Sequence, residues 1–452
     1  MRFDKYEWIA ISIMVFLFIL VGFIQGWSVS LVILNMCIIS AIMTMGVNIS
    51  WGYAGVINFG VMGFLAMGGL AAVLVSYPPV KEAWYVGGSG LGISLVLLVA
   101  VVTAVYFITK LVEKKSYKYW LNGFVIFFGL IIIRYFFLNA TDRIEEVDPA
   151  LAGFLGGANL PIIFSWAVGG FFAGGVAFVI GKVALGLRSD YLAIVTLGIS
   201  EIVVSVLKHE EWLSRGVKNV IGLKRPVPYE INLQVSDWFI TMVTWFNSSK
   251  LNQIIDPDQK QQILNNLIID SSSLFVKLNY AILFFTVMIV IYYFANKAQI
   301  SPWGRMMRAI RDNEISANAM GKNIVARHLQ VFVLGSIVVG IAGAMLTTLD
   351  GQLTPGTYQP LRFTFLIWVM VILGGSGNNW GAVLGGFVVW FFWIQAEPIG
   401  LWLMDTITAG MSDDNALRKH LLESAAHMRL MTMGIILLVV LRFSPRGLIP
   451  EK

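Results

Sequence analysis

The amino-acid sequence predicts an all-α polytopic membrane protein with about ten to twelve transmembrane helices, some of them broken or re-entrant, and a further helix on the cytoplasmic side. Three observations support this fold class. Of the 452 residues, 57% are hydrophobic. Charged residues make up 13%, about half of the roughly 25% that is usual in soluble domains. The apolar residues also gather in runs close to the ~20 residues that a helix needs to cross a bilayer.

The same composition excludes several classes of protein. An apolar content this high excludes a disordered chain and an ordinary cytosolic enzyme. Cys37 is the only cysteine, so no internal disulfide can form and a secreted disulfide scaffold is excluded. The net charge of +6 comes from 32 Lys and Arg against 26 Asp and Glu. We interpret it as loop charge that orients the chain in lipid, and we expect no nucleic-acid partner.

Twelve apolar segments are the predicted spans. The first is expected to be a retained helix and not a secretory signal, because no small-residue cleavage site follows it. The predicted spans are residues 9–26, 29–46, 56–76, 91–110, 120–138, 162–186, 191–207, 278–296, 328–349, 363–374, 381–397 and 430–442.

Two regions are too rich in glycine to be uninterrupted spans. Five glycines lie between Gly46 and Gly69, and the motif GGSGNNWG interrupts residues 363–397. Interrupted backbone is tolerated at membrane depth only where protein or a water-filled cavity surrounds it. Both regions are therefore predicted to be broken helices that line a pathway.

Loop charges predict the orientation and the domain organisation. With the N-terminus inside, cytoplasmic segments hold 16 Lys and Arg and short external loops hold six, so both termini are expected in the cytoplasm. Residues 208–277 form the one sizeable polar stretch, predicted to be an external loop or a small external subdomain. It separates an N-terminal transmembrane half, residues 1–207, from a C-terminal half, residues 278–452.

Enzyme motifs are missing from the sequence. Gly181-Lys182 is followed by valine and lacks the upstream glycine of a P-loop, and neither G-x-S-x-G nor H-E-x-x-H occurs. The four histidines show no metal-ligand spacing with Cys37. We therefore predict no catalytic residue, no metal site and no cofactor, and we expect a protein that is not an enzyme.

The cytoplasmic loop at residues 297–327 is the most informative segment. Ser301-Pro302 opens a helix, since proline is tolerated in the first turn, and Gly321 can end it. Between them, apolar and charged residues alternate at helical spacing, which predicts one amphipathic helix over 305–321. An ordinary positively charged loop is the alternative. The cost of ordering so long a loop favours a helix that docks on a partner.

Four blocks of the chain resemble the branched-chain amino-acid permeases of the M type, within the ABC importers. They are GYAGVINFGVMGFLAMGG at 52–69, LRSDYLAIVTLGISEIV at 187–203, the run from GRMMRAIRDNEISANAMGKN at 304–323 to ILGGSGNNWGAVLGG at 372–386, and FSPRGLIP at 443–450. Glu314 to Gly321 is similar to the E-A-A-x-x-x-G segment that seats in the ATPase subunit. The chain departs from it at Ile315-Ser316, and the Ile-x-Leu-Pro tail of many such permeases is absent.

The resemblance implies a transport subunit without chemistry of its own, in a bacterial inner membrane. Such permeases pair with a second homologous permease and two cytoplasmic ATPases, and they receive solute from a periplasmic binding protein. Within the predicted helix, five residues are expected to couple ATP hydrolysis to transport. They are Arg308, Arg311, Glu314, Ala317 and Gly321, with Ala317 small enough to enter a cleft and Gly321 free to turn the chain.

Three polar residues inside predicted spans are candidates for the transport pathway, because polar groups are costly in lipid. Glu201 either faces the pathway or makes a helix–helix contact. Asn58 and Thr196 either contact the solute or make structural hydrogen bonds.

A glycine ladder at Gly377, Gly381 and Gly385 has the G-x-x-x-G spacing that permits close helix approach. We expect it to pack within the subunit or against the partner permease.

Three functions remain open from the sequence. The first is an ABC importer permease for branched-chain or other hydrophobic amino acids. The second is the same subunit of a urea or short-amide importer. The third is a self-contained secondary transporter or a channel, of which the former would need more intramembrane ionisable residues.

Overall fold

A computed structural model describes residues 5–150, 153–412 and 415–451 of the chain. Each predicted span coincides with an apolar helix. These helices are α1 (Lys5–Ile24), α2 (Trp27–Val47), α3 (Val61–Ser76), α4 (Lys81–Leu111), α5 (Lys115–Glu145), α6 (Phe164–Ala184), α7 (Ser189–His209), α12 (Pro257–Ile300), α15 (Ile324–Asp350), α16 (Pro360–Gly374), α17 (Asn379–Ile407) and α19 (Met428–Phe443).

The polar segments between them form short elements. These are a π-helical turn (Asn48–Gly52), α8 (Glu211–Ser214), β1 (Val220–Ile221), α9 (Glu230–Val235), α10 (Asp237–Phe246), α11 (Ser248–Leu251), α13 (Pro302–Asp312), α14 (Glu314–Ala319), β2 (Gln352–Leu353) and α18 (Ala416–Ser424), with 3-10 turns at Gly216–Lys218, Pro355–Thr357 and Ala425–His427.

The number of spans agrees with the predicted ten to twelve. Among the described residues, nine helices are long and apolar enough to cross a membrane, and α18 with α19 makes a tenth if this bent pair is one span. The helices α3 and α16 are apolar but shorter. The chain is therefore an all-α polytopic membrane protein, as predicted.

The centre of the bundle is built on small residues, with α3, α6 and α15 packed together. A Cβ atom on Gly340 of α15 would lie 2.5 Å from the carbonyl oxygen of Gly169, and one on Gly169 would lie 3.1 Å from the Cα of Gly68. Lipid offers no hydrophobic driving force for helix association, so close backbone packing of this kind is what holds such bundles together.

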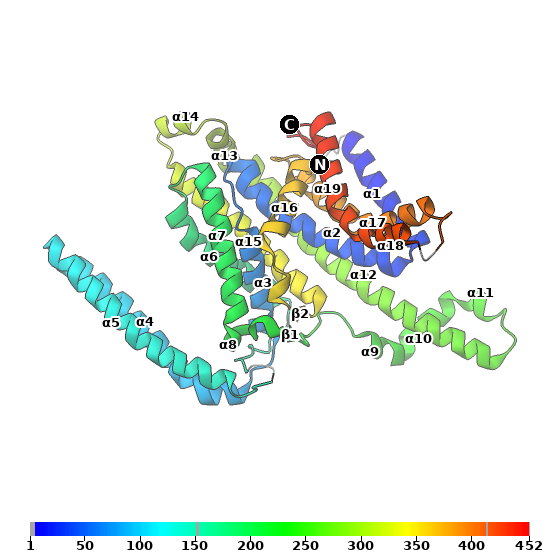
Figure 1. Ribbon diagram of the computed structural model, residues 1–452, viewed down its shortest axis with the longest axis horizontal. Helices are drawn as coiled ribbons and strands as arrows, with labels where there is room; N and C mark the ends of the chain where they lie inside the picture. The colour runs from blue at the N-terminus through cyan, green and yellow to red at the C-terminus, as the bar shows by residue number, and fades with distance from the viewer. Residues whose placement is uncertain (1–4, 151–152, 413–414, 452) are drawn as a thin grey trace.

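Contacts between loops separate two sides of the bundle. On one side, which we call the α13 side, the Arg311 side chain reaches the Gly52 carbonyl and the Glu451 carboxylate. On the opposite side, β1 pairs antiparallel with β2, and Val220 lies opposite Leu353. Figure 1 marks both chain ends near α13, so the two termini lie on the α13 side.

The helices α4 and α5 form a long hairpin that stands away from the bundle (Figure 1). They pack along each other, with Val101 of α4 against Gly129 of α5, and most of their other side chains are exposed. A small buried cluster of Ala83, Ile144 and Leu155 anchors the base of the hairpin. Its surface is as apolar as a lipid-facing surface must be.

The 208–277 segment is folded into short helices where the sequence predicted an external loop or subdomain. Its last part belongs to α12, which begins at Pro257 because the Asp256 side chain accepts a hydrogen bond from the Asp258 amide. At 44 residues, α12 is about 66 Å long and extends beyond a ~30 Å hydrocarbon core. The predicted boundary at 277/278 therefore falls inside a continuous helix.

Candidate functional site

Two breaks in the helices meet on the α13 side. The first is the π-helical turn that ends α2, after which the chain runs irregularly from Gly55 to Gly60. The second is the loop at 375–378 between α16 and α17, where Gly375 and Gly377 both have positive φ. Both breaks fall in the regions that the sequence predicted to be interrupted. Single π-turns of this kind occur frequently at functional sites.

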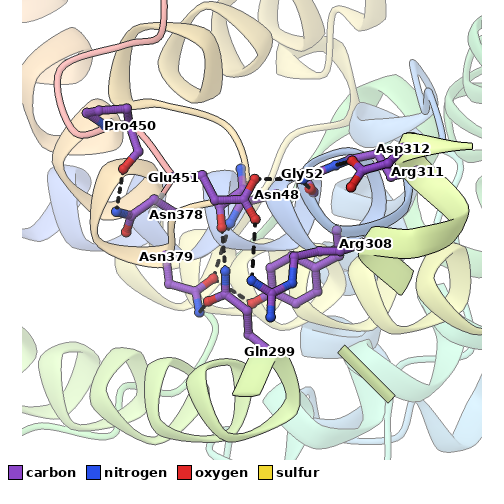
Figure 2. A network of polar contacts seen from close by, with 12 residues as sticks. Asn48, Gly52, Gln299, Arg308, Arg311, Asp312, Asn378, Asn379, Pro450 and Glu451 are labelled. Atoms are coloured by element: carbon purple, nitrogen blue, oxygen red, sulfur yellow. Dashed lines mark hydrogen bonds and ion pairs between the residues drawn. The ribbon is translucent and has the colours of Figure 1, made fainter. Parts of the chain in front are cut away.

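A buried network of amide side chains joins the two breaks (Figure 2). The Asn48 Oδ1 atom accepts a hydrogen bond from the Gly377 amide at 2.8 Å, and its Nδ2 donates to Asn379 Oδ1 at 3.1 Å. Tyr53 donates its hydroxyl to the same Asn379 oxygen at 2.6 Å. The Asn379 Nδ2 atom donates in turn to Gln299, at the end of α12, at 3.0 Å. Buried amides that satisfy one another hold a single arrangement, so this joint is rigid.

The helix α13 is tied to this joint by Arg311. Its guanidinium donates to the carbonyl of Gly52, in the π-turn, and pairs with the Glu451 carboxylate at 2.7 Å. Arg308, one turn earlier, lies 4.0 Å from the other Glu451 oxygen. Charge-assisted hydrogen bonds are stronger than neutral ones, which makes Arg311 the main link between α13 and the breaks.

Glu451 is brought to α13 by the C-terminal strap, which we define as residues 444–451. The Leu448 and Ile449 amides donate to the carbonyls of Leu373 and Gly374 at 2.8 and 3.0 Å. The Asn378 side chain donates to the Pro450 carbonyl at 3.2 Å. The strap is therefore fastened along the second break. Sequence reasoning missed Glu451, since no local spacing relates a tail residue to a helix 140 positions earlier.

The single helix predicted over 305–321 is wrong in its continuity. The chain forms α13 and α14, which are separated at Asn313, where the backbone is extended with φ −157° and ψ 97°. The Asn313 side chain accepts a hydrogen bond from the Ser316 amide at 2.9 Å and caps α14. Asparagine at a helix N-terminus is a strong cap, and that signal could have predicted the break.

The coupling candidates of α14 point in different directions. Glu314 is exposed, with its carboxylate 3.4 Å from the His328 ring. Ala317 is buried and faces the chain itself, whereas we expected it to enter a cleft on a partner. The outward side chains are Ile315 and Met320, which are 84% and 80% exposed. Gly321 has φ +75°, the conformation that ends a helix with glycine.

Asn58 and Thr196 both serve the first break. The Asn58 side chain accepts from the Gly60 amide at 2.8 Å, at the start of α3. Thr196 of α7 accepts from the Phe59 amide at 3.0 Å. Both side chains are buried, so in this structure they make structural hydrogen bonds, which was one of the two predicted roles. Glu201, also on α7, is exposed.

The glycine ladder is shorter than predicted. Gly381 and Gly385 lie on α17, where added Cβ atoms would meet the carbonyls of Gly374 and Met370 on α16. Gly377 precedes the helix and has φ +84°. A Cβ atom there would lie 3.0 Å from the Arg311 guanidinium. Packing within the subunit thus accounts for two of the three glycines. At the third, the positive φ and the Glu451 carboxylate, 2.5 Å from an added Cβ atom, exclude a side chain together with Arg311.

Comparisons with known proteins bear on the family of this chain. The family model described as branched-chain amino acid transport system / permease component matches residues 29–441. The probable branched-chain amino acid transport permease protein LivM of Methanocaldococcus jannaschii is 28% identical over 166 residues, covering 36% of this chain and 44% of that protein. The high-affinity branched-chain amino acid transport system permease protein LivM of Escherichia coli K12 is 25% identical over 224 residues, covering 49% and 48%.

The aligned part of the chain thus spans about half the length of the curated relatives. No solved structure matches the chain significantly. Since the family model covers most of the sequence, the chain belongs to the permease component family of branched-chain amino acid transport systems.

Proposed function

We propose that this chain is the permease subunit of an ATP-driven importer for branched-chain or other hydrophobic amino acids. It forms the translocation pathway with a second, homologous permease. The assembly includes two cytoplasmic ATP-binding subunits, and α13 and α14 are the elements through which this chain contacts them. A periplasmic binding protein delivers the solute on the β1–β2 side. The α13 side is cytoplasmic in a bacterial inner membrane, in keeping with the 16 Lys and Arg of the predicted cytoplasmic segments.

The observation that carries this proposal is the connection from α13 to both helix breaks. A displacement of α13 acts on the π-turn through the Gly52 carbonyl and on the α16–α17 loop through Glu451 and the strap. Because the amide joint is rigid, the two breaks respond together. Movement at the ATPase contact would thereby change the pathway that the broken helices line.

The coupling residues divide into two groups. Arg308 and Arg311 transmit movement inward to the strap and the π-turn. Glu314, Ala317 and Gly321 shape α14, whose exposed Ile315 would meet the ATPase surface. Ala317 acts from the buried side of α14, where it packs against the rest of the chain.

The test is to express the tagged chain with its genomic neighbours and to reconstitute the purified assembly in liposomes. Two ATPases and a second permease should co-purify. Uptake should require ATP on the side of the membrane that carries the ATPases, together with the binding protein. An Arg311→Gln variant should assemble and hydrolyse ATP but lose most of its uptake. Arg305→Gln is the matched control on the same helix, because Arg305 is exposed and bonds the Ile300 carbonyl next to its own helix. Uptake by the chain alone, without any ATPase, would refute the proposal.

A further inference from the structure

The helix α7 has an exposed surface of two distinct chemical kinds. Its buried face, which includes Leu192, Val204 and Leu207, packs into the bundle. On the exposed surface, Gly198, Glu201 and Ser205 follow one another at intervals of three and four residues and form a polar stripe. The neighbouring exposed stripe of Ile202 and Val206 is apolar. A helix that faced lipid alone would carry apolar residues on both stripes.

The position of Glu201 makes the polar stripe informative. It is the thirteenth residue of α7, so it lies about 18 Å along the axis from Ser189, near the middle of a ~30 Å hydrocarbon core. Within the described residues, no ion pair or hydrogen bond engages its carboxylate. A charge at this depth is strongly disfavoured against acyl chains, and such residues face the bundle interior or water. The exposed carboxylate therefore requires either water or protein beside it in the membrane.

The surface beside Glu201 carries no side chain at Gly198. A Cβ atom there would meet no other atom of this chain within 4 Å. One turn further on, the Ser205 hydroxyl lies 3.3 Å from Nδ1 of His209. This extends the polar stripe to the end of α7 on the β1–β2 side. The stripe thus runs from mid-membrane to the surface where the solute would arrive.

We infer that Gly198, Glu201 and Ser205 line a water-filled solute pathway between this chain and its partner permease. The Glu201 carboxylate there attracts the ammonium group of a zwitterionic amino acid. The inference rests on the proposed function for the identity of the partner. Thr196 and Ser200, on the opposite face of α7, hold the helix in place by accepting hydrogen bonds from the backbone at Phe59 and Gly63.

Cysteine accessibility tests the pathway directly, because Cys37 is the only cysteine and is buried. In a Cys37→Ala background, the assembled transporter would carry Gly198→Cys, Ser205→Cys, Ile202→Cys or Val206→Cys, one at a time. The last two are matched controls, since Ser205 and Val206 lie at adjacent depth. A thiol reacts as its thiolate, which forms in water and not in lipid, and a charged, membrane-impermeant reagent also stays in water. Cysteines on the wet stripe should therefore react at least about tenfold faster than the controls.

Uptake should also fall after modification at Gly198→Cys, and excess solute with its binding protein should slow the modification. Slow reaction at all four positions would overturn the inference. That result would include the case in which the polar stripe packs against the partner permease without water between them. The proposed function is tested separately, by the ATP dependence of uptake before labelling. Uptake without ATP but with a reactive stripe would refute the importer proposal and leave the pathway in place.

Charge is tested by Glu201→Gln and Glu201→Asp. The glutamine variant should raise the KM for a zwitterionic solute about tenfold, and the aspartate variant should recover part of the loss. Glu423→Gln, at an exposed position on α18, is the control. An unchanged KM in the glutamine variant would overturn the role of the charge. If that variant fails to assemble, the cysteine comparison still decides whether the stripe is wet.

Discussion

Replacing Glu451 with glutamine isolates the link between the C-terminal strap and α13. The variant keeps the shape of the side chain but removes the negative charge that pairs with Arg311 at 2.7 Å and lies 4.0 Å from Arg308. The side chains of Glu451 and Arg311 are 22% and 26% exposed, so water screens the pair only in part.

The size of the effect follows from this partial burial. Fully exposed ion pairs contribute about 0.5 kcal/mol. Hydrogen bonds to charged groups contribute about 2 kcal/mol when they are well shielded. The Glu451 pair lies between them, at about 1 kcal/mol, which corresponds to about a fivefold change in an equilibrium or rate at 25 °C. The strap itself should stay in place, because its backbone bonds at Leu448 and Ile449 do not involve the carboxylate.

The assay compares binding-protein-stimulated ATP hydrolysis with solute uptake in the same proteoliposomes. Glu451→Gln should lower the number of solutes moved per ATP about fivefold, while the subunits still co-purify. In a double-mutant cycle, Glu451→Gln should add little to the loss in Arg311→Gln, since the Arg311–Glu451 ion pair is already absent there. Fully additive losses, or an unchanged ratio of uptake to hydrolysis in Glu451→Gln, would refute the role of the strap in coupling.

Three further substitutions test other parts of the structure. Gly385→Val places side-chain atoms against the Met370 carbonyl of α16 and should destabilise the subunit by about 3 kcal/mol, seen as loss of folded protein in detergent thermal-shift measurements, whereas Gly434→Val, at an open position on α19, should not. Asn313→Ala removes the cap of α14 and should cost about 1 kcal/mol of local stability, measured as faster amide hydrogen exchange in α14 and not in α13; equal exchange in parent and variant would argue against the cap. Gly321→Val forces a β-branched residue to φ +75° and should uncouple hydrolysis from uptake while the membrane subunits remain assembled; normal uptake would contradict the role of this turn.

Much of the fold could be predicted because it follows from chain-local properties. The length of each apolar run sets whether a helix crosses the bilayer, so α1, α2 and the other spanning helices were found at the predicted places. Glycine density and the GGSGNN motif likewise marked the two breaks, since unsatisfied backbone needs protein or water around it. The family could be identified because its motifs are contiguous stretches of sequence.

Two helix boundaries were not predicted, because the local sequence there is compatible with more than one structure. The continuity of α12 through residue 277 was missed because residues 257–277 mix polar and apolar side chains and hold no uninterrupted apolar run of bilayer length. The break at Asn313 was missed because asparagine is tolerated within a helix and is also an N-cap, and hydropathy does not distinguish the two.

The direction in which each side chain points was decided by tertiary structure alone. Ala317 lies on the buried side of α14, whereas sequence spacing suggested a cleft on a partner. Gly377 lies against the Glu451 carboxylate and the Arg311 guanidinium, whereas sequence spacing suggested a helix ladder. The contact between Arg311 and Glu451 joins residues 140 positions apart, and it exists only because the strap is bonded along α16. Amino-acid sequence thus determined which segments enter the membrane and which family the chain belongs to, because apolar runs and glycine-rich motifs are local properties. The connection from α13 to the breaks depends on close approach between distant segments, which only the packed bundle provides.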